Sequence, residues 1–236
     1  MKSFQTILAL FFLLILNPAG LHSQQCDYFI PLRENTGMEF QTFNMRDRLQ
    51  GSQEMTVTRV ESDGEEVTAI IRTKIFDRRD NMEHEGEYSV TCSGNQMSID
   101  IESMMDPTMM EEFQKMDLTI EGQDLIIPAQ LSEGQTLPDA AMTMTVSNAG
   151  MTLMEMNMKI TNRKVEGREQ ITVPAGEYDC YKISYETHTE SRAAGMPFSN
   201  TIKTIEYHAP NVGVVRTEMF DQKGRPQGYT VLSKVF

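Results

Sequence analysis

Apolar and polar residues alternate with a period of two along most of the chain beyond residue 30. Alternation of this kind, interrupted by turn residues, predicts β-strands joined as antiparallel hairpins. Segments 37–47, 177–190 and 201–208 are predicted as strands, and the total is about ten. Four hairpins are predicted: 55–60 with 67–71 across 62–64, 88–92 with 97–101 across 93–95, 142–146 with 154–160 across 148–150, and 215–219 with 229–236 across 221–224.

One segment departs from this period. Asp106 can accept hydrogen bonds from the free backbone N–H groups at a helix start, and Pro107 suits the first helical position. Met109, Phe113 and Met116 follow at spacings of four and three residues, which places them on one face of a helix. The sequence therefore predicts a short amphipathic helix near 106–116, lying over one side or end of the sheet.

The connecting segments and the apolar faces of the strands together predict the overall architecture. Segment 122–139 reads as a partly irregular connection and 192–200 as a loop between long strands. Strands with one apolar face suit an antiparallel sheet that packs on one side, and a long twisted sheet curls. The predicted fold is all-β with one short helix: a strongly curved antiparallel sheet, half-barrel or lipocalin-like, with a β-sandwich as the alternative. No linker divides 24–236, so a single β domain is expected.

The first 23 residues have the pattern of a secretory signal peptide. Lys2 gives a positive start, 4–16 is almost continuously apolar, and 17–20 breaks the run before a cleavage site after Ser23. The apolar run is shorter than the roughly 20 residues of a transmembrane helix. A lipoprotein would need a small residue before Cys26, where Gln25 stands. We expect a soluble, exported product with no transmembrane segment after cleavage, located in the periplasm or secreted.

The net charge of the chain limits the classes of partner that we expect. It carries 21 basic and 34 acidic residues, for a net charge of −13. An acidic protein repels the phosphate backbone, so nucleic acid is not expected as a partner. An apolar small molecule or lipid and another envelope protein remain as expected partners.

Three cysteines fit an exported chain with one disulfide and one leftover thiol. We predict a Cys26–Cys92 disulfide, because Cys26 lies near the mature N-terminus and Cys92 closes a predicted strand, and we expect Cys180 to be buried as a small apolar group. No two cysteines have the spacing of a zinc finger, so no metal site is predicted.

The chain contains 19 methionines, many of them on one face of predicted elements. Three interpretations compete: methionine as a filler of the core, a ligand cavity lined by adaptable thioethers, and Cu(I) capture. Copper is the weakest of the three, because no histidine lies between Met97 and Met158. The candidate ligand-binding residues are Met109, Phe113, Met116, Met142, Met144, Met154, Met156 and Met158.

No motif in the chain predicts catalysis or a cofactor. A nucleophile elbow, a zinc-binding His-Glu-x-x-His pair, a phosphate loop and a dinucleotide fingerprint are all missing from the sequence. His84, His188 and His208 are far apart in the sequence and are expected at the surface. The sequence therefore predicts no catalytic residue. A buried carboxylate pair, or a His–carboxylate pair in a cleft, would favour a hydrolase.

Several short segments resemble one family of exported proteins. These are Cys-Asp-Tyr-Phe-Ile-Pro-Leu at 26–32, Gly-Met-Glu-Phe at 37–40, Val-Pro-Ala-Gly-Glu-Tyr-Asp-Cys-Tyr-Lys-Ile at 173–183, Gly-Val-Val-Arg at 213–216 and Lys-Gly at 223–224. Together they are similar to the TapB-like exported bacterial proteins of unknown function. The resemblance implies a β-protein of a Gram-negative envelope and brings no catalytic residues. In physical terms, 173–176 should form an extended segment and a turn, since the residue before proline avoids the helical region.

The sequence favours an exported, non-enzymatic envelope protein that binds an apolar, lipid-like ligand or an envelope partner in a methionine-rich concavity. A structural or protein-interaction module without a ligand is the alternative, and a hydrolase comes third.

The cysteine assignment gives a direct prediction. Peptide mass mapping of the unreduced protein should find Cys26 joined to Cys92, and alkylation under denaturing conditions should label Cys180 alone. A linked peptide that contains Cys180 would contradict the assignment.

Overall fold

The computed structural model describes residues 31–101, 116–193 and 196–236. These residues form one antiparallel sheet of thirteen strands in the order β6-β8-β9-β10-β11-β12-β13-β1-β2-β3-β4-β5-β7. The described residues contain no helix. The strands are β1 Gly37–Asn44, β2 Leu49–Asp63, β3 Glu66–Asp77, β4 Met82–Ser93, β5 Gln96–Ile99, β6 Asp117–Gln123, β7 Leu125–Pro128, β8 Ala140–Asn148, β9 Met151–Val173, β10 Gly176–Ala193, β11 Met196–Ala209, β12 Gly213–Asp221 and β13 Pro226–Val235.

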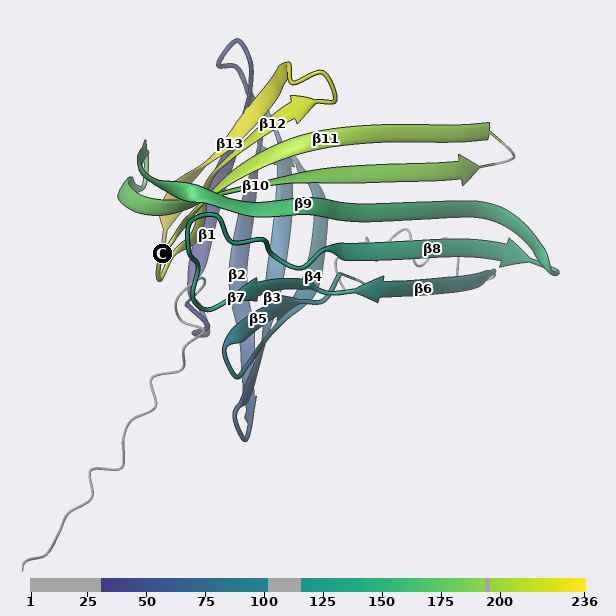
Figure 1. Ribbon diagram of the computed structural model, residues 1–236, viewed down its shortest axis with the longest axis horizontal. Coiled ribbons are helices and arrows are strands. Elements are labelled where there is room, and N and C mark those ends of the chain that lie inside the picture. The colour runs from purple at the N-terminus through teal and green to yellow at the C-terminus, as the bar shows by residue number, and fades with distance from the viewer. Residues whose placement is uncertain (1–30, 102–115, 194–195) are drawn as a thin grey trace, which may run out of the picture.

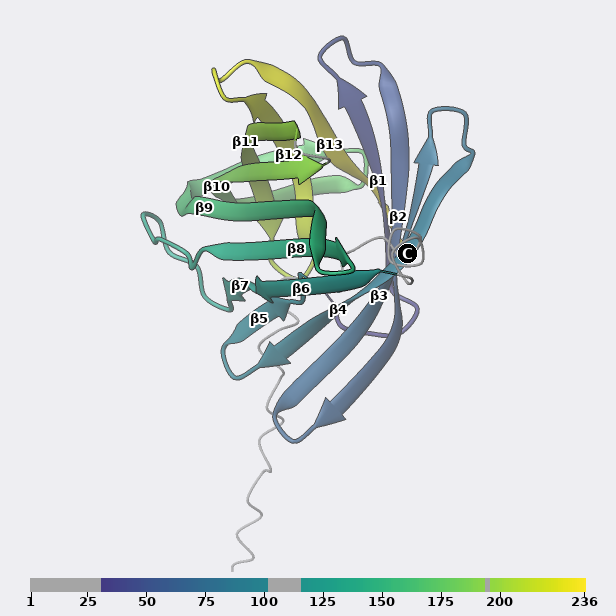
Figure 2. The ribbon, with the colours of Figure 1, turned by 90° about the vertical axis from the view of Figure 1, so that its right-hand side faces the viewer.

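The prediction of a strongly curved antiparallel sheet is confirmed. In Figure 2, β1–β4 form one wall and β8–β11 the other, with β12 and β13 joining them on one side and β5 and β7 on the opposite side. The four predicted hairpins are the pairs β2–β3, β4–β5, β8–β9 and β12–β13. The predicted helix falls outside the described residues, apart from Met116, which lies in a bend before β6.

Two predicted loops contain strands instead. Segment 122–139 includes β7 and the end of β6, and most of 192–200 belongs to the β10–β11 hairpin. Pro197 favoured a loop in the sequence, because proline has no N–H to donate to a sheet. The structure tolerates it because residues 196–201 of β11 pair with β10 only, and β12 joins β11 from Ile202 onward.

The sheet closes toward a barrel through one extended segment. Strands β6 and β7 follow each other directly, with Asp124 between them, and lie in line in Figure 1. β6 pairs with β8 at one end of the strand order, and β7 pairs with β5 at the other. The same stretch of chain therefore contributes to both ends of the sheet and brings them together.

The buried side chain of Arg163 in β9 stabilises the junction where the two ends of the sheet meet. Arg163 is 3 % exposed, and its Nη1 donates hydrogen bonds to the carbonyl of Ile126 in β7, at 2.9 Å, and to that of Pro138. The chain that leaves β7 also hydrogen-bonds to the backbone of β9, from the N–H of Leu137 to the carbonyl of Arg163 at 2.9 Å. Residues from β7, β9 and the segment before β8 are thus held at one point.

The apolar residues form two separate cores. One fills the interior between the walls and includes Ile71, Val90, Met97, Ile127 and Ile183. The other lies where the end of the β9–β10 hairpin folds against β11–β13 and β1, with buried side chains from Phe40, Ile171, Val173, Cys180, Tyr207, Val215, Val231 and Leu232.

The turn of the β9–β10 hairpin holds the second core in place. A turn was predicted within the Val-Pro-Ala-Gly segment, at Ala175 and Gly176; it lies one residue earlier, at Pro174 and Ala175, with Val173 paired to Gly176. The N–H of Ala175 donates to the carbonyl of Leu232 in β13 at 3.3 Å. Figure 1 shows this end of the hairpin curling over toward β13.

The role of Arg163 in closing the sheet is testable. Arg163→Met should lower the free energy of unfolding by about 2–4 kcal/mol, because it leaves two buried carbonyls without their donor. Lys164→Met is the matched control, since Lys164 is exposed and its ion pair with Glu166 is at the surface; its cost should stay within about 0.5 kcal/mol. Urea unfolding measures both. Equal stability of the two variants would show that the guanidinium does not fasten the junction.

Candidate functional site

A cavity of about 360 Å³ lies inside the curved sheet, where strands from its two ends meet. Its described lining comes from β5 and β7 on one side and from β9–β12 on the other. Apolar side chains predominate, and the polar side chains are those of Tyr185, Thr187, Glu206 and His208. The apolar lining residues are Met97, Ile99, Ile101, Leu125, Ile127, Met158, Ile160 and Val214.

The polar side of the cavity is centred on the carboxylate of Glu206. The phenol of Tyr185 donates to Oε1 of Glu206 at 2.7 Å, and Nε2 of His208 lies 2.8 Å from Oε2. Glu206 and His208 are two apart in β11, so they project from the same face of the strand. The side chain of His208 is 5 % exposed and that of Glu206 is 22 % exposed, so Glu206 is the more accessible of the two.

An interruption of the β9–β10 ladder places Tyr185 and Arg163 beside this cluster. The pairing runs Ser184 to Lys164 and resumes at Glu186 to Thr161, so Tyr185 of β10 and 162–163 of β9 fall in a bulge. Asn162 has a φ of 57°, in the left-handed region. Bulges re-aim side chains relative to a regular ladder. Here the bulge brings Tyr185 to Glu206 and Arg163 to the junction of the sheet.

These contacts set the charge of the cluster. Burial alone would raise the pKa of Glu206, but the hydrogen bond and charge of His208, the phenol of Tyr185 and the charge of Arg163 hold it below its ordinary value. Burial and the neighbouring carboxylate raise the pKa of Tyr185 well above its ordinary value. At neutral pH, Glu206 is therefore ionised and Tyr185 keeps the proton that it donates.

The predicted methionine site is only partly brought together. Met158 lines the cavity. Met142 and Met144 are buried in β8, where they pair with Met158 and Met156 of β9, and Met156 and Met154 are half-buried. Met116 is half-buried at its bend, while Met109 and Phe113 lie outside the described residues.

The polar cluster was missed by the sequence analysis. The expectation that the histidines lie at the surface is wrong for His208, which is buried against Glu206. The available signal was the alternation of Thr204, Glu206 and His208 along one strand face. That signal is ambiguous, because polar residues at every second position are also typical of a solvated face.

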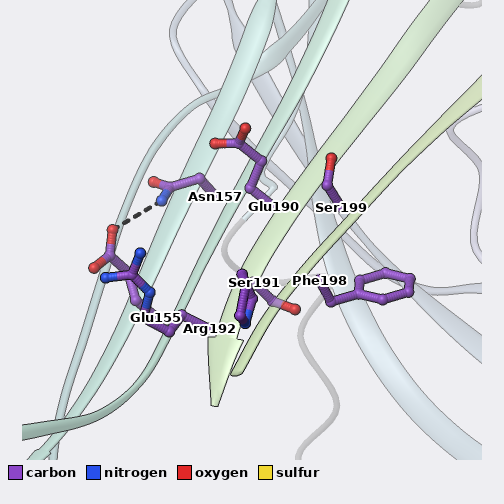
Figure 3. A pocket seen from close by; sticks show the side chains of 8 residues that line it. Glu155, Asn157, Glu190, Ser191, Arg192, Phe198 and Ser199 are labelled. Atoms are coloured by element: carbon purple, nitrogen blue, oxygen red, sulfur yellow. Dashed lines mark hydrogen bonds between the residues drawn. The ribbon is translucent and has the colours of Figure 1, made fainter. Parts of the chain in front are cut away.

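A second depression, of about 290 Å³, lies at the far end of β9–β11 (Figure 3). Its wall contains Glu155, Asn157, Arg192 and Phe198, and the amide of Asn157 donates to Glu155 at 2.9 Å. Phe198 is 60 % exposed, and most of the other lining residues are exposed and polar. This depression lacks the buried polar cluster of the cavity, and we take the cavity as the candidate site.

The described part of the chain contains no group of three or more histidine, cysteine, aspartate or glutamate side chains placed to hold a metal ion. None of its elements is a helix long and apolar enough to cross a membrane. Cys180 is a free, buried thiol, and burial raises its pKa to about 11. Cys26 lies outside the described residues, so its disulfide with Cys92 stays a prediction.

Comparisons with known proteins place the fold. Residues 33–232 match a family model described as DUF3108-like. A crystal structure from Bacteroides fragilis, of a protein described as exported and of YmcC-like fold, has a TM-score of 0.68 at 18 % identity, covering 89 % of this chain and 99 % of that one. A Parabacteroides distasonis structure, described as a lipoprotein, has a TM-score of 0.66 at 22 % identity and covers 89 % and 98 %.

Both likenesses show the fold, and the two descriptions agree with the export predicted from residues 1–23. No curated protein matches the chain. The narrower resemblance to the TapB-like proteins is not tested by these matches and stays an expectation.

The state of Glu206 predicts a loss of stability in acid. Because folding holds its pKa below the ordinary 4.5, the carboxylate contributes stability above that pH, and the contribution is lost as the pH falls through the folded-state pKa. In the Glu206→Gln variant, the urea concentration at the unfolding midpoint should therefore fall less steeply between about pH 5 and 3 than in the wild-type protein. Glu65→Gln, in the exposed β2–β3 turn, is the control. A wild-type slope in the Glu206 variant would contradict the assignment.

Proposed function

The chain belongs to the DUF3108-like family, and from that premise we propose that it is an exported β-protein of the bacterial envelope that binds an apolar, lipid-like ligand in the cavity lined by β5, β7 and β9–β12. The role is one of binding and carrying, without chemistry on the ligand. The resemblance to the TapB-like exported proteins and the descriptions of the two structural neighbours support the envelope location.

The observation that carries the proposal is the composition of the cavity wall. Small-molecule sites are typically concave and mostly apolar, with a few polar groups that converge, and they span roughly 300–1,000 Å³. The cavity has about 360 Å³, eight large apolar side chains and one hydrogen-bonded polar cluster. Met97 and Met158 add unbranched thioether chains that repack easily around different apolar shapes.

A hydrolase is supported less well. The pair formed by Glu206 and His208 is one element that such an enzyme needs, and it does face a cavity. A hydrolase of the usual kind also needs an activated nucleophile beside the histidine. The described lining of the cavity contains no serine or cysteine, and its one aliphatic hydroxyl is that of Thr187. Glu206 also compensates the charge of the buried Arg163, as it would in a purely structural module, so the feature that favours binding is the apolar cavity beside it.

Ligand binding can be tested with the neutral apolar fluorophore N-phenyl-1-naphthylamine. The wild-type protein should enhance and blue-shift its fluorescence saturably, because the cavity removes the probe from water. Ile160→Trp adds a large side chain to the wall and should weaken binding by about tenfold or more, a cost of roughly 1.4 kcal/mol. Leu153→Trp is the control, since Leu153 is exposed near the start of the same strand and is not part of the described lining of the cavity.

Native mass spectrometry of protein purified gently from its own envelope gives an independent test. A retained, dissociable mass in the lipid range is expected. Circular dichroism and urea unfolding should show that the Ile160 and Leu153 variants remain folded. A wild-type protein that neither takes up the fluorophore nor retains any lipid would overturn the proposal in favour of a structural module.

A further inference from the structure

The polar cluster specifies more about the ligand than apolar character. We propose that the cavity selects amphiphiles whose polar end donates hydrogen bonds to Glu206, with a primary ammonium group preferred, a hydroxyl group next and a carboxylate or phosphate disfavoured. This inference rests on the proposed function and names the chemistry of the ligand head within it.

The charge of the wall is the first reason. Glu206 is the only aspartate, glutamate, lysine or arginine in the described lining of the cavity, and its pKa is held below its ordinary value. An anionic head placed beside it would meet a like charge in surroundings that screen poorly. A cationic head would instead gain a charge-assisted hydrogen bond, and such bonds are about twice as strong as neutral ones.

The free capacity of the carboxylate is the second reason. An ionised carboxylate offers about four lone-pair sites for hydrogen bonds. The phenol of Tyr185 occupies one site on Oε1 and the ring of His208 one site on Oε2. Each oxygen therefore retains capacity to accept a further donor. The 22 % exposure of the Glu206 side chain leaves surface that such a donor can reach.

Preorganisation is the third reason. Tyr185 in β10 and His208 in β11 each form a hydrogen bond with one oxygen of the Glu206 carboxylate. The carboxylate is therefore already oriented before any ligand binds. Fixing a binding group in advance reduces the entropy lost on binding. The hydroxyl-bearing side chain of Thr187 lines the same cavity and adds a neutral polar group to it.

The neighbouring cation does not reverse this preference. Arg163 is absent from the described lining, and its Nη1 bonds to the carbonyls of Ile126 and Pro138 rather than into the cavity. Its charge interacts with Glu206 and also with Asp139, so it offsets part of the charge of the carboxylate without lining the cavity itself. The ring of His208 bonds to Oε2 of the same carboxylate and is only 5 % exposed, so it offers little surface to the head of a ligand. Neither residue turns the wall into an anion site.

The test compares three ligands that share one chain and differ in the head: decylamine, decanol and decanoate, each displacing N-phenyl-1-naphthylamine at neutral pH. The wild-type protein should bind decylamine about tenfold or more tighter than decanoate, the ratio expected for one hydrogen bond to a charged group, with decanol between them. Glu206→Gln, which removes the charge and keeps the shape, should shrink the ratio to about threefold or less. Glu121→Gln, at an exposed site in β6, controls for the general attraction of an acidic protein to cations and should leave the ratio unchanged.

The outcomes separate the two proposals. If neither the fluorophore nor any decyl ligand binds, the proposed function fails. If the fluorophore binds but decanoate equals or exceeds decylamine, the inference fails and the function stands. An unchanged ratio in Glu206→Gln also overturns the inference. If that variant does not fold, the order of the three heads on the wild-type protein decides alone.

Discussion

The hydrogen bonds from the Arg163 guanidinium to the carbonyls of Ile126 and Pro138 are the constraint on which the rest of the structure depends. An open sheet of thirteen strands would present unpaired backbone at both edges, and such edges invite association with other chains. Here one extended segment contributes to both edges, and Arg163 holds that segment against β9. A buried arginine is costly unless its charge and N–H groups are compensated. The two carbonyls and the charges of Glu206 and Asp139 supply that compensation.

Closure of the sheet also creates the cavity. β5 and β7 reach the neighbourhood of β9 and β10 only because the two ends of the sheet meet, and the cavity wall is drawn from both sides of that junction. The bulge that presents Arg163 to the junction presents Tyr185 to Glu206 as well. The structural and candidate functional parts of the molecule therefore share one irregularity in one hairpin. A change in the bulge would disturb the closure and the polar cluster together.

The β9–β10 hairpin is long because it serves two cores. β9, of 23 residues, begins beside β8 and ends at the turn that packs on the second core, and β10, of 18 residues, returns from that turn. Both strands contribute side chains to the wall of the cavity. The turn is tied to β13 through Ala175 and Leu232. A straight hairpin could not reach both places. The register shifts near Ile183 and Tyr185 supply the bend, since bulges curve a strand and increase its twist.

The sequence by itself determined the local features: the positions of most strands, four hairpins and a turn within 173–176. These follow from period-two patterning and turn residues, which act between neighbours in the chain. Export was indicated separately, by the apolar run of the first 23 residues. Segment 192–200 was misread because proline was weighed without knowing that its part of β11 lacks a second neighbouring strand.

Only the tertiary structure decided which faces meet. Alternation shows that a strand has two faces but not what covers each, so Glu206 and His208 could equally have pointed to water. Their burial depends on the pairing of β11 with β10 and on the closure by a segment some 80 residues earlier, near Ile126. Contacts between residues so distant in the sequence are set by the packing of the whole sheet, because no local propensity encodes them.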